Sequence, residues 1–226
     1  MRRTITGFSN PTIKFLRSLR EMTTEIGAVL IFDEIIAFRV GPNGAQGLLG
    51  VTPDLTTLGK IIGGGYALAA FGGRAEIMDR FDARRHDAMS HGGTFNGNPV
   101  AAAAGLATLR ELTPDRYDRL AELGGRLRAR LADAFARDGI DAHVDGIASL
   151  FQVFTGPTLA GEAGLAASQT LFLGLLVDGF HLAPRGMGAI STPVTEQDVD
   201  ELADAIVGRL GVMSGRPAAP VASAIR

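Results

Sequence analysis

A short apolar stretch that ends in a carboxylate constrains this chain more than any other feature. Residues 28–32 read AVLIF and are followed at once by Asp33. A strand without polar alternation is typical of a parallel sheet that is buried on both faces. A helix is predicted before it, since Asn10 with the proline that follows favours a helix start and Gly27 favours its end. The predicted helix has an apolar stripe formed by Phe15, Leu19, Met22 and Ile26. This order predicts an α/β fold with Asp33 at the carboxyl end of a central strand, where open α/β sheets bind ligands.

Composition excludes several classes of function. The chain has 226 residues and a formal net charge of -2, and its basic residues are scattered, so neither a nucleic-acid groove nor a membrane-surface patch is expected. The sequence has no cysteine, which removes disulfides and thiolate metal ligands and fits a reducing compartment. The four histidines lack paired spacing, so no metal site is expected. No secretory signal and no apolar run of the ~20 residues of a spanning helix is visible, and we expect a cytoplasmic protein.

The middle of the chain is rich in glycine. Residues 37–60 show little regular pattern and are predicted to form a functional loop. Residues 67–73 (ALAAFGG) predict a short buried strand, and Asn98 with the next proline predicts the start of an alanine-rich helix through Leu109. The small residues of that helix indicate close packing against a neighbouring element.

The last hundred residues predict a smaller α+β unit. Pro114 begins a predicted helix that Gly139 ends, with an apolar stripe at Leu120, Leu123, Leu127, Leu131 and Phe135. Residues 147–155 predict one strand, and residues 162–178 an apolar helix closed by Gly179. The stretches HLAP and AISTP predict short strands. Thr195 and Asp198 resemble a capping box before a last helix with Val199, Leu202, Ile206 and Leu210 on one face.

These elements predict three segments. Residues 1–112 would be part of a large domain, residues 113–212 a small α+β domain, and residues 213–226 a flexible tail.

A nucleotide-hydrolysing enzyme is excluded by the residues around Lys60. The phosphate loop of such enzymes needs G-x-x-x-x-G-K-[ST], normally before the acidic strand. Here Ile61 stands where serine or threonine must bind magnesium, and Asp54 stands where the first glycine belongs. The only Gly-Lys pair also follows the acidic strand. No G-x-G-x-x-G follows a strand, so a dinucleotide fingerprint is absent as well.

Lys60 and Asp33 together suggest a cofactor site. Lys60 lies in a glycine-flanked segment, where an amine can be partly desolvated for carbonyl chemistry. Pyridoxal phosphate needs such a lysine and a carboxylate for its ring nitrogen. The alternatives are a solvated surface lysine and an aspartate that serves as a cap or an ion-pair partner.

Three long motifs resemble the class-III aminotransferases. They are LIFDEI, GAQGLLGVTPDLTTLGKIIGGGYALAAFGGR and HGGTFNGNPVAAAAGLATL. The likeness is greatest to the branch with glutamate-1-semialdehyde aminomutase and the β-amino-acid aminotransferases, and it covers residues 5 to 210. It implies a fold-type-I transferase with a mostly parallel sheet in its large domain, and a homodimer with active sites at the interface.

The resemblance also implies roles for single residues. Asp33 would pair with the pyridinium nitrogen of the cofactor, and Lys60 would form the Schiff base and shuttle protons. Thr94 would bind the cofactor phosphate of the partner subunit, with help from the Gly93 amide, and Ile36 would pack against the ring. Without the resemblance, the turn at Gly93 and Thr94 has a simpler account as the cap of the next helix.

Arg185 bears on the substrate. It lies in LAPRGMG, and a similar arginine in β-phenylalanine-type members binds the substrate carboxylate, for which a guanidinium is the natural partner. The alternative is a surface arginine beside a turn.

The sequence departs from the family in its start. Full-length relatives have roughly another half-length upstream, so we expect an exposed apolar sheet edge beside residues 28–32 and little turnover by the isolated chain. The predicted function is a pyridoxal-phosphate-dependent aminotransferase that acts on a β- or other non-α amino acid and a keto acid. The alternatives are glutamate-1-semialdehyde 2,1-aminomutase and a non-catalytic fragment or split-enzyme subunit with a complementary N-terminal-half chain.

Overall fold

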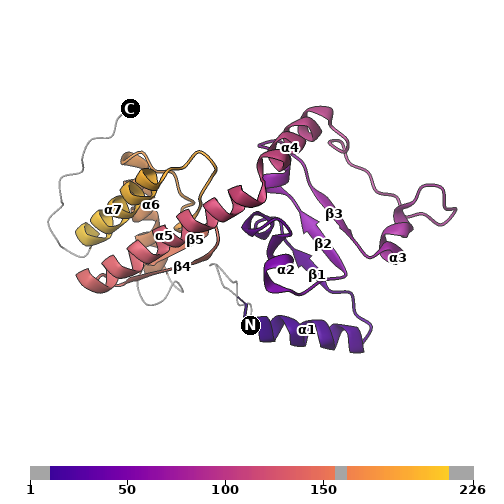
Figure 1. Ribbon diagram of the computed structural model, residues 1–226, viewed down its shortest axis with the longest axis horizontal. Coiled ribbons are helices and arrows are strands. Elements are labelled where there is room, and N and C mark those ends of the chain that lie inside the picture. The colour runs from indigo at the N-terminus through magenta and orange to yellow at the C-terminus, as the bar shows by residue number, and fades with distance from the viewer. Residues whose placement is uncertain (1–10, 156–161, 214–226) are drawn as a thin grey trace. The chain divides into compact units, whose positions relative to one another are not determined.

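The computed structural model describes residues 11–155 and 162–213 (Figure 1). They form two compact units, which we call the N-terminal unit (residues 11–117) and the C-terminal unit (residues 118–155 and 162–213). Both combine helices with a three-stranded sheet. Asn10 and nearly all of the predicted tail, residues 213–226, lie outside the described residues. Within the described ranges no helix has the length and apolar character needed to cross a membrane.

The N-terminal unit is built around a mixed sheet. Its elements are α1 (Ile13–Glu25), β1 (Ile31–Asp33), η1 (Ala37–Val40), α2 (Gly44–Leu49), β2 (Leu55–Leu58), η2 (Lys60–Gly63), β3 (Ala70–Gly73), α3 (Ala75–Met78), η3 (Asp79–Phe81) and α4 (Pro99–Glu111). The strand order is β1-β2-β3, with β1 parallel and β3 antiparallel to β2. The predicted unstructured loop 37–60 is wrong, because it contains η1, α2 and β2. Elements of four to six residues are too short to show a periodic pattern.

The first helix is confirmed, but its cap and its exposure differ from the prediction. Thr12 caps α1, because its Oγ1 accepts a hydrogen bond from the backbone N–H of Phe15 at 3.2 Å. The predicted apolar stripe is largely exposed: Phe15 is 59%, Met22 56% and Ile26 69% accessible, and Leu16 is the buried residue of the helix. An apolar stripe at helical spacing therefore identified the helix but not a buried face.

Strand β1 lies at the edge of its sheet rather than at the centre. Ile31 is 53% accessible, so the prediction of a strand buried on both faces is wrong for the described chain. The physical reason is that no described strand pairs with the side of β1 that faces away from β2. The expected exposed apolar edge beside residues 28–32 is thereby confirmed.

The C-terminal unit has an antiparallel sheet covered by long helices. Its elements are α5 (Pro114–Asp138, whose first turn belongs to the N-terminal unit), β4 (Ala142–Ile147), β5 (Leu150–Thr155), α6 (Glu162–Val177), β6 (Met187–Ala189) and α7 (Glu196–Met213). The strand order is β4-β5-β6. The single strand predicted for residues 147–155 is instead the turn of a hairpin and its second strand. HLAP is not a strand, and the strand predicted at AISTP lies earlier, as β6.

The apolar stripes predicted for α5 and α7 are buried as expected. Leu127 and Leu131 of α5 and Val199 and Ile206 of α7 have no accessible surface. The capping box is confirmed, since the backbone N–H of Thr195 donates to Asp198 Oδ2 at 2.7 Å and the backbone N–H of Asp198 donates to Thr195 Oγ1 at 3.2 Å.

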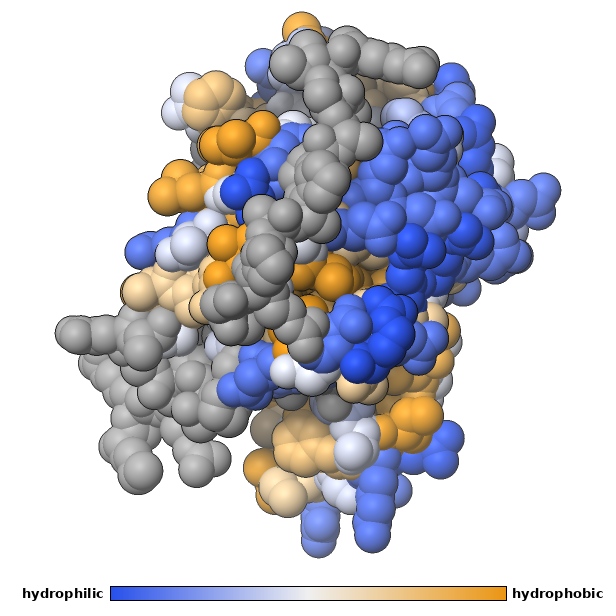
Figure 2. All heavy atoms as spheres, turned by 90° about the vertical axis from the view of Figure 1, so that its left-hand side faces the viewer, coloured by the Kyte–Doolittle hydropathy of each residue, from blue (hydrophilic) through white to orange (hydrophobic). Residues whose placement is uncertain are grey.

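Charged side chains join the outer faces of the same two helices. Arg126 contacts Asp200 at 2.6 Å, and Arg130 contacts Asp204 at 2.8 Å. The side of the molecule shown in Figure 2 has one broad hydrophilic region and separate apolar areas. The helices are therefore amphipathic, with an apolar core on one side and ion pairs in contact with water on the other.

Candidate functional site

Asp33 is held at the carboxyl end of β1 by one of its two carboxylate oxygens. Its register partner on β2 is Thr57, whose hydroxyl donates to Asp33 Oδ1 at 3.3 Å. The backbone N–H of Ile35 donates to the same oxygen at 3.0 Å. In the described part of the chain, Oδ2 accepts no hydrogen bond. The side chain is exposed, so an oriented carboxylate presents one oxygen to a ligand.

Lys60 follows the neighbouring strand of the same sheet. β2 ends at Leu58, and Lys60 begins η2. Because β1 and β2 are parallel, their carboxyl ends lie at the same end of the sheet. Asp33 and Lys60 therefore both lie at this end. Lys60 Nζ makes no hydrogen bond or ion pair with a described residue, and the side chain is exposed. The sheet thus places a carboxylate and an unpaired amine at the same end of two neighbouring strands.

The backbone at Lys60 is in an uncommon conformation. Its φ is 49°, a left-handed value that among the described non-glycine residues is otherwise found only at Ala148. Such a conformation costs on the order of 1–3 kcal/mol and persists only where neighbouring structure imposes it. It is typical of functional sites, although it does not identify the function.

Close contacts on both sides impose this conformation. A Cβ atom built on Gly59 would lie 3.3 Å from Ile35 Cγ2, so the loop after β1 packs directly on the residue before Lys60. Gly64 has a φ of 57°, and a Cβ there would lie 2.5 Å from the carbonyl oxygen of Ala104 in α4. A Cβ on Gly105 would lie 2.3 Å from the carbonyl oxygen of Ile62. The close packing predicted from the small residues of α4 is therefore confirmed, and its partner is η2.

The two carboxylates of DEI have different surroundings. Glu34 is 1% accessible, and its two oxygens accept from the backbone N–H groups of Ala45 at 3.0 Å and Gln46 at 2.7 Å. Glu34 therefore fixes the start of α2 and is structural. Ile36, predicted to pack on the cofactor ring, is exposed and immediately precedes η1.

Gly93 and Thr94 lie in an exposed turn just before α4. The backbone N–H of Asn96 donates to the Gly93 carbonyl at 3.0 Å, which closes the turn. Asn98 Oδ1 accepts from the backbone N–H groups of the second and third residues of α4, at 3.0 Å each, and is the predicted cap. The turn is anchored to the sheet because His91 packs edge-to-face on Phe71 of β3, with ring centroids 5.1 Å apart.

Arg185 belongs to the C-terminal unit and is the one predicted site residue outside the N-terminal unit. It lies in the turn before β6 and is exposed. Its guanidinium makes no ion pair with any described carboxylate, whereas Arg209 of α7 pairs with Asp178. An unpaired, exposed guanidinium is available to an external anion.

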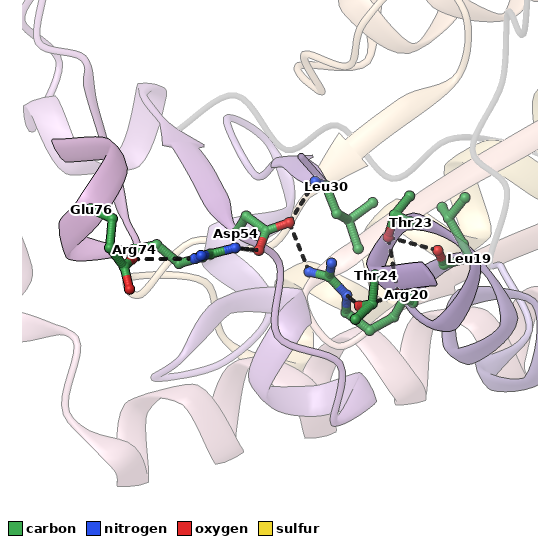
Figure 3. A network of polar contacts seen from close by, with 8 residues as sticks. All are labelled: Leu19, Arg20, Thr23, Thr24, Leu30, Asp54, Arg74 and Glu76. Carbon is green, nitrogen blue, oxygen red and sulfur yellow. Dashed lines mark hydrogen bonds and ion pairs between the residues drawn. The ribbon is translucent and has the colours of Figure 1, made fainter. Parts of the chain in front are cut away.

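A buried carboxylate stabilises the amino-terminal end of β2, at the opposite end of the strand from Lys60. Asp54 contacts Arg20 of α1 at 2.9 Å and Arg74 after β3 at 3.2 Å, and accepts from the backbone N–H of Leu30 at 2.7 Å (Figure 3). The Leu30 N–H and the two guanidinium groups lower the pKa of Asp54 to about 2. Asp54 therefore joins α1, β1 and β3, and holds the sheet that supports the site.

Sequence reasoning missed Thr57 and Gly59. Thr57 orients Asp33, and Gly59 permits the contact with Ile35. Recognising LTTL as a strand beside β1 would have revealed Thr57, since its register with Asp33 follows from the parallel pairing.

Two other features of the described residues do not add to the site. An open hollow of about 430 Å³ contains none of the predicted site residues and is lined by Phe38, Pro42, Asn43, Gln46, Gly47 and Thr52. In the described ranges no group of three or more potential metal-ligating side chains occurs.

Comparison with known proteins places these motifs in context. The family model of aminotransferase class-III matches residues 4–201. The chain is 43% identical over 204 residues to a beta-phenylalanine transaminase of Variovorax paradoxus, with 87% of this chain and 47% of that protein covered. It is 40% identical over 218 residues to a glutamate-1-semialdehyde 2,1-aminomutase of Akkermansia muciniphila, with 91% and 51% covered. The chain thus spans about half the length of the curated relatives it matches.

The fold of the chain is also similar to solved structures of transaminases. An omega-transaminase from Sphaerobacter thermophilus superimposes with a TM-score of 0.86 at 39% identity, covering 90% of this chain and 49% of that one. A transaminase with PLP bound gives a TM-score of 0.86 at 38% identity, covering 92% and 50%. The predicted fold class is confirmed by these similarities.

Proposed function

This chain belongs to the class-III aminotransferase family, and on that premise we propose that it provides the lysine and the ring-nitrogen carboxylate of a pyridoxal 5'-phosphate site. The proposal rests on one observation: Asp33 and Lys60 lie at the same end of two neighbouring parallel strands. Asp33 Oδ2 and Lys60 Nζ make no hydrogen bond with a described residue. The proposed reaction is amino transfer from a β- or other non-α amino acid to a keto acid.

The residues fit the three chemical parts of the cofactor. Lys60 offers an amine for the aldehyde, and Asp33 Oδ2 offers a negative charge for the ring nitrogen. The turn with Gly93 and Thr94 offers a hydroxyl and backbone N–H groups, the donors that a phosphate requires. Ile36 is an exposed apolar side chain three residues after Asp33 and suits a ring face.

Each residue would have a distinct task. The bound cofactor supplies an electron sink for the substrate carbanion. Asp33 would keep the ring nitrogen protonated, and Thr57 would keep Asp33 oriented. Lys60 Nζ would bind the cofactor and later move a proton from the substrate carbon. The packing of Gly59 and Gly64 would hold Lys60 in place for both tasks.

Arg185 would bind the substrate carboxylate. Its support is the unpaired guanidinium and the similarity to the Variovorax transaminase, whose name gives β-phenylalanine as its substrate. A planar guanidinium can bind a carboxylate through two parallel hydrogen bonds.

The aminomutase remains the second candidate, because relatives named glutamate-1-semialdehyde 2,1-aminomutase match at nearly the same identity. An aminomutase needs no external keto acceptor, so the dependence of turnover on added keto acid separates the two reactions. A split-enzyme role predicts activity only when a complementary chain is added, whereas a non-catalytic fragment predicts no cofactor adduct at Lys60.

We further propose a homodimer with shared sites, in which Thr94 serves the partner's cofactor, and a cytoplasmic location. Sedimentation and cell fractionation would test these two proposals.

The sequence offers a clean test, because it has only two lysines, Lys14 on α1 and Lys60. The 226-residue chain is incubated with pyridoxal phosphate, reduced with borohydride, digested and mapped by mass spectrometry. We expect the adduct on Lys60, its loss in Lys60→Ala and its retention in Lys14→Ala. An adduct confined to Lys14, or no adduct on either lysine, would contradict the proposed site.

A further inference from the structure

The turn that presents Arg185 is closed by its own backbone. The N–H of Ala183 donates to the carbonyl of Met187 at 2.8 Å, and the N–H of Gly186 donates to the carbonyl of Ala183 at 2.8 Å. These two bonds define the turn, but they leave the carbonyl of Arg185 itself unbound. The orientation of the Arg185 peptide therefore depends on a further contact.

Strand β5 supplies that contact. The N–H of Val153 donates to the carbonyl of Gly186 at 3.0 Å, and Gln152 Nε2 donates to the carbonyl of Arg185 at 3.0 Å. Gly186 has a φ of 77°, and a Cβ on it would lie 2.4 Å from the carbonyl oxygen of Val153. The turn thus lies directly on β5, and a side-chain amide holds its central peptide.

Gln152 is an unusual residue for its position. All six residues of β5 are buried, and Gln152 is 2% accessible. Burying an amide costs free energy unless its groups are hydrogen-bonded, and an apolar side chain of similar size would fill the same space without that requirement. The bond to Arg185 gives the amide a purpose that packing alone does not.

We propose that Gln152 is a positioning residue for Arg185, so that the arginine presents its guanidinium to a substrate carboxylate from a fixed base. This inference rests on the proposed function of Arg185. The backbone of the residue is fixed by Gln152 while its guanidinium makes no contact with a described carboxylate. A bidentate arginine–carboxylate pair is sensitive to such support, since small errors in geometry weaken both hydrogen bonds.

The first test needs no turnover. Gln152→Met removes the donor and keeps the length, and Gln152→Asn keeps the amide but shortens its reach. The control is Gln197→Met, an exposed glutamine of α7 that contacts Glu201. We expect amide hydrogen exchange at Ala183 and Gly186 of the full chain to rise about tenfold in both Gln152 variants and to stay unchanged in the control. Unchanged exchange, or an equal rise throughout the C-terminal unit, would overturn the proposal.

The second test separates this inference from the proposed function. Transfer from β-phenylalanine is compared with transfer from 1-phenylethylamine, which lacks the carboxylate, with pyridoxal phosphate and a complementary N-terminal-half chain added to the 226-residue chain. In Gln152→Met we expect KM for β-phenylalanine to rise about tenfold with kcat kept, KM for the amine to stay unchanged, and no further loss when Gln152→Met is added to Arg185→Met. If Arg185→Met alone keeps the discrimination, the proposed role of Arg185 fails and the inference with it. If Arg185→Met loses the discrimination and Gln152→Met keeps it, only the inference fails.

Discussion

The C-terminal unit buries the apolar stripes of α5 and α7, whereas the N-terminal unit leaves the apolar stripe of α1 exposed. Leu127 and Ile206 are fully inaccessible, but Phe15 and Ile26 are more than half exposed. The same apolar spacing thus has different outcomes in the two units. In the C-terminal unit, α5 and α7 pack on a sheet whose central strand is buried along its length. In the N-terminal unit, β1 is an edge strand among the described elements, and α1 buries one residue.

The difference shows that a closely packed local structure can form on a small core. The residues around Lys60 are fixed by close backbone contacts with Ile35 and α4 rather than by large buried side chains. The supporting sheet is joined by the ion pairs of Asp54. Local geometry can therefore be specific where the apolar core is not extensive.

The largest expected effect lies in the core of the C-terminal unit. Leu127→Ala would remove a fully buried side chain and destabilise this unit by about 2–5 kcal/mol. Phe15→Ala on the exposed face of α1 should change stability by about 0.5 kcal/mol or less. Urea unfolding followed by residue-resolved hydrogen exchange would measure both. A large loss of stability in Phe15→Ala would mean that the apolar face of α1 is covered. It would contradict the contrast between the two units.

Two glycine substitutions should change the free energy of unfolding in opposite directions. Gly105→Ala would place a Cβ 2.3 Å from the carbonyl oxygen of Ile62, and forcing η2 away from α4 should cost about 1–3 kcal/mol. Gly125→Ala in α5 meets no atom within 4 Å and should stabilise its helix by about 0.5–1 kcal/mol. Both tyrosines, Tyr66 and Tyr117, lie in the N-terminal unit, so tyrosine fluorescence in urea reports its unfolding separately from circular dichroism. Equal changes in the free energy of unfolding for the two substitutions would contradict the close packing of α4 on η2, the short helix that begins at Lys60.

The N-terminal unit should lose stability in acid through Asp54. Its pKa is about 2 in the folded chain, below the ordinary value of 3.8, so its contribution is complete above pH 4 and is lost as the pH falls towards 2. Asp54→Asn should lower the thermal midpoint at pH 7 and flatten the pH dependence between 4 and 2. Tyrosine fluorescence melts at several pH values would measure it, with the exposed Asp79→Asn as control. If the thermal midpoint of Asp54→Asn falls with pH as steeply as that of the unsubstituted chain, other carboxylates dominate the acid destabilisation.

The smallest expected effects lie at the helix caps. Thr195→Ala removes the hydroxyl that accepts from the backbone N–H of Asp198 and donates to Asp198 Oδ2, and should cost about 1 kcal/mol, measured by urea unfolding. Thr12→Ala removes a single 3.2 Å bond from a helix that buries one residue, and should cost the N-terminal unit about 0.5 kcal/mol. The reverse order would indicate that α1 contributes more to its unit than its exposure suggests.

Sequence patterns predicted the long elements. The helices α5, α6 and α7 span 16 to 25 residues, long enough for their periodicity to be evident. The short elements α2, β2 and β4 were missed, because their few residues carry no distinct period. The hydrogen bonds of Thr57 and Gln152 could not be predicted for another reason, since each joins a residue to a different strand or turn.

By itself the sequence determined that Asp33 follows an apolar strand, that Lys60 lies among glycines, and that the chain belongs to its family, because these are properties of neighbouring residues along one segment. The tertiary structure alone decided which apolar residues are buried, that β1 is an edge strand in the described chain, and that Asp33 and Lys60 share one end of the sheet. These features depend on strand pairing and packing between residues distant in sequence, which periodicity within a single segment does not encode.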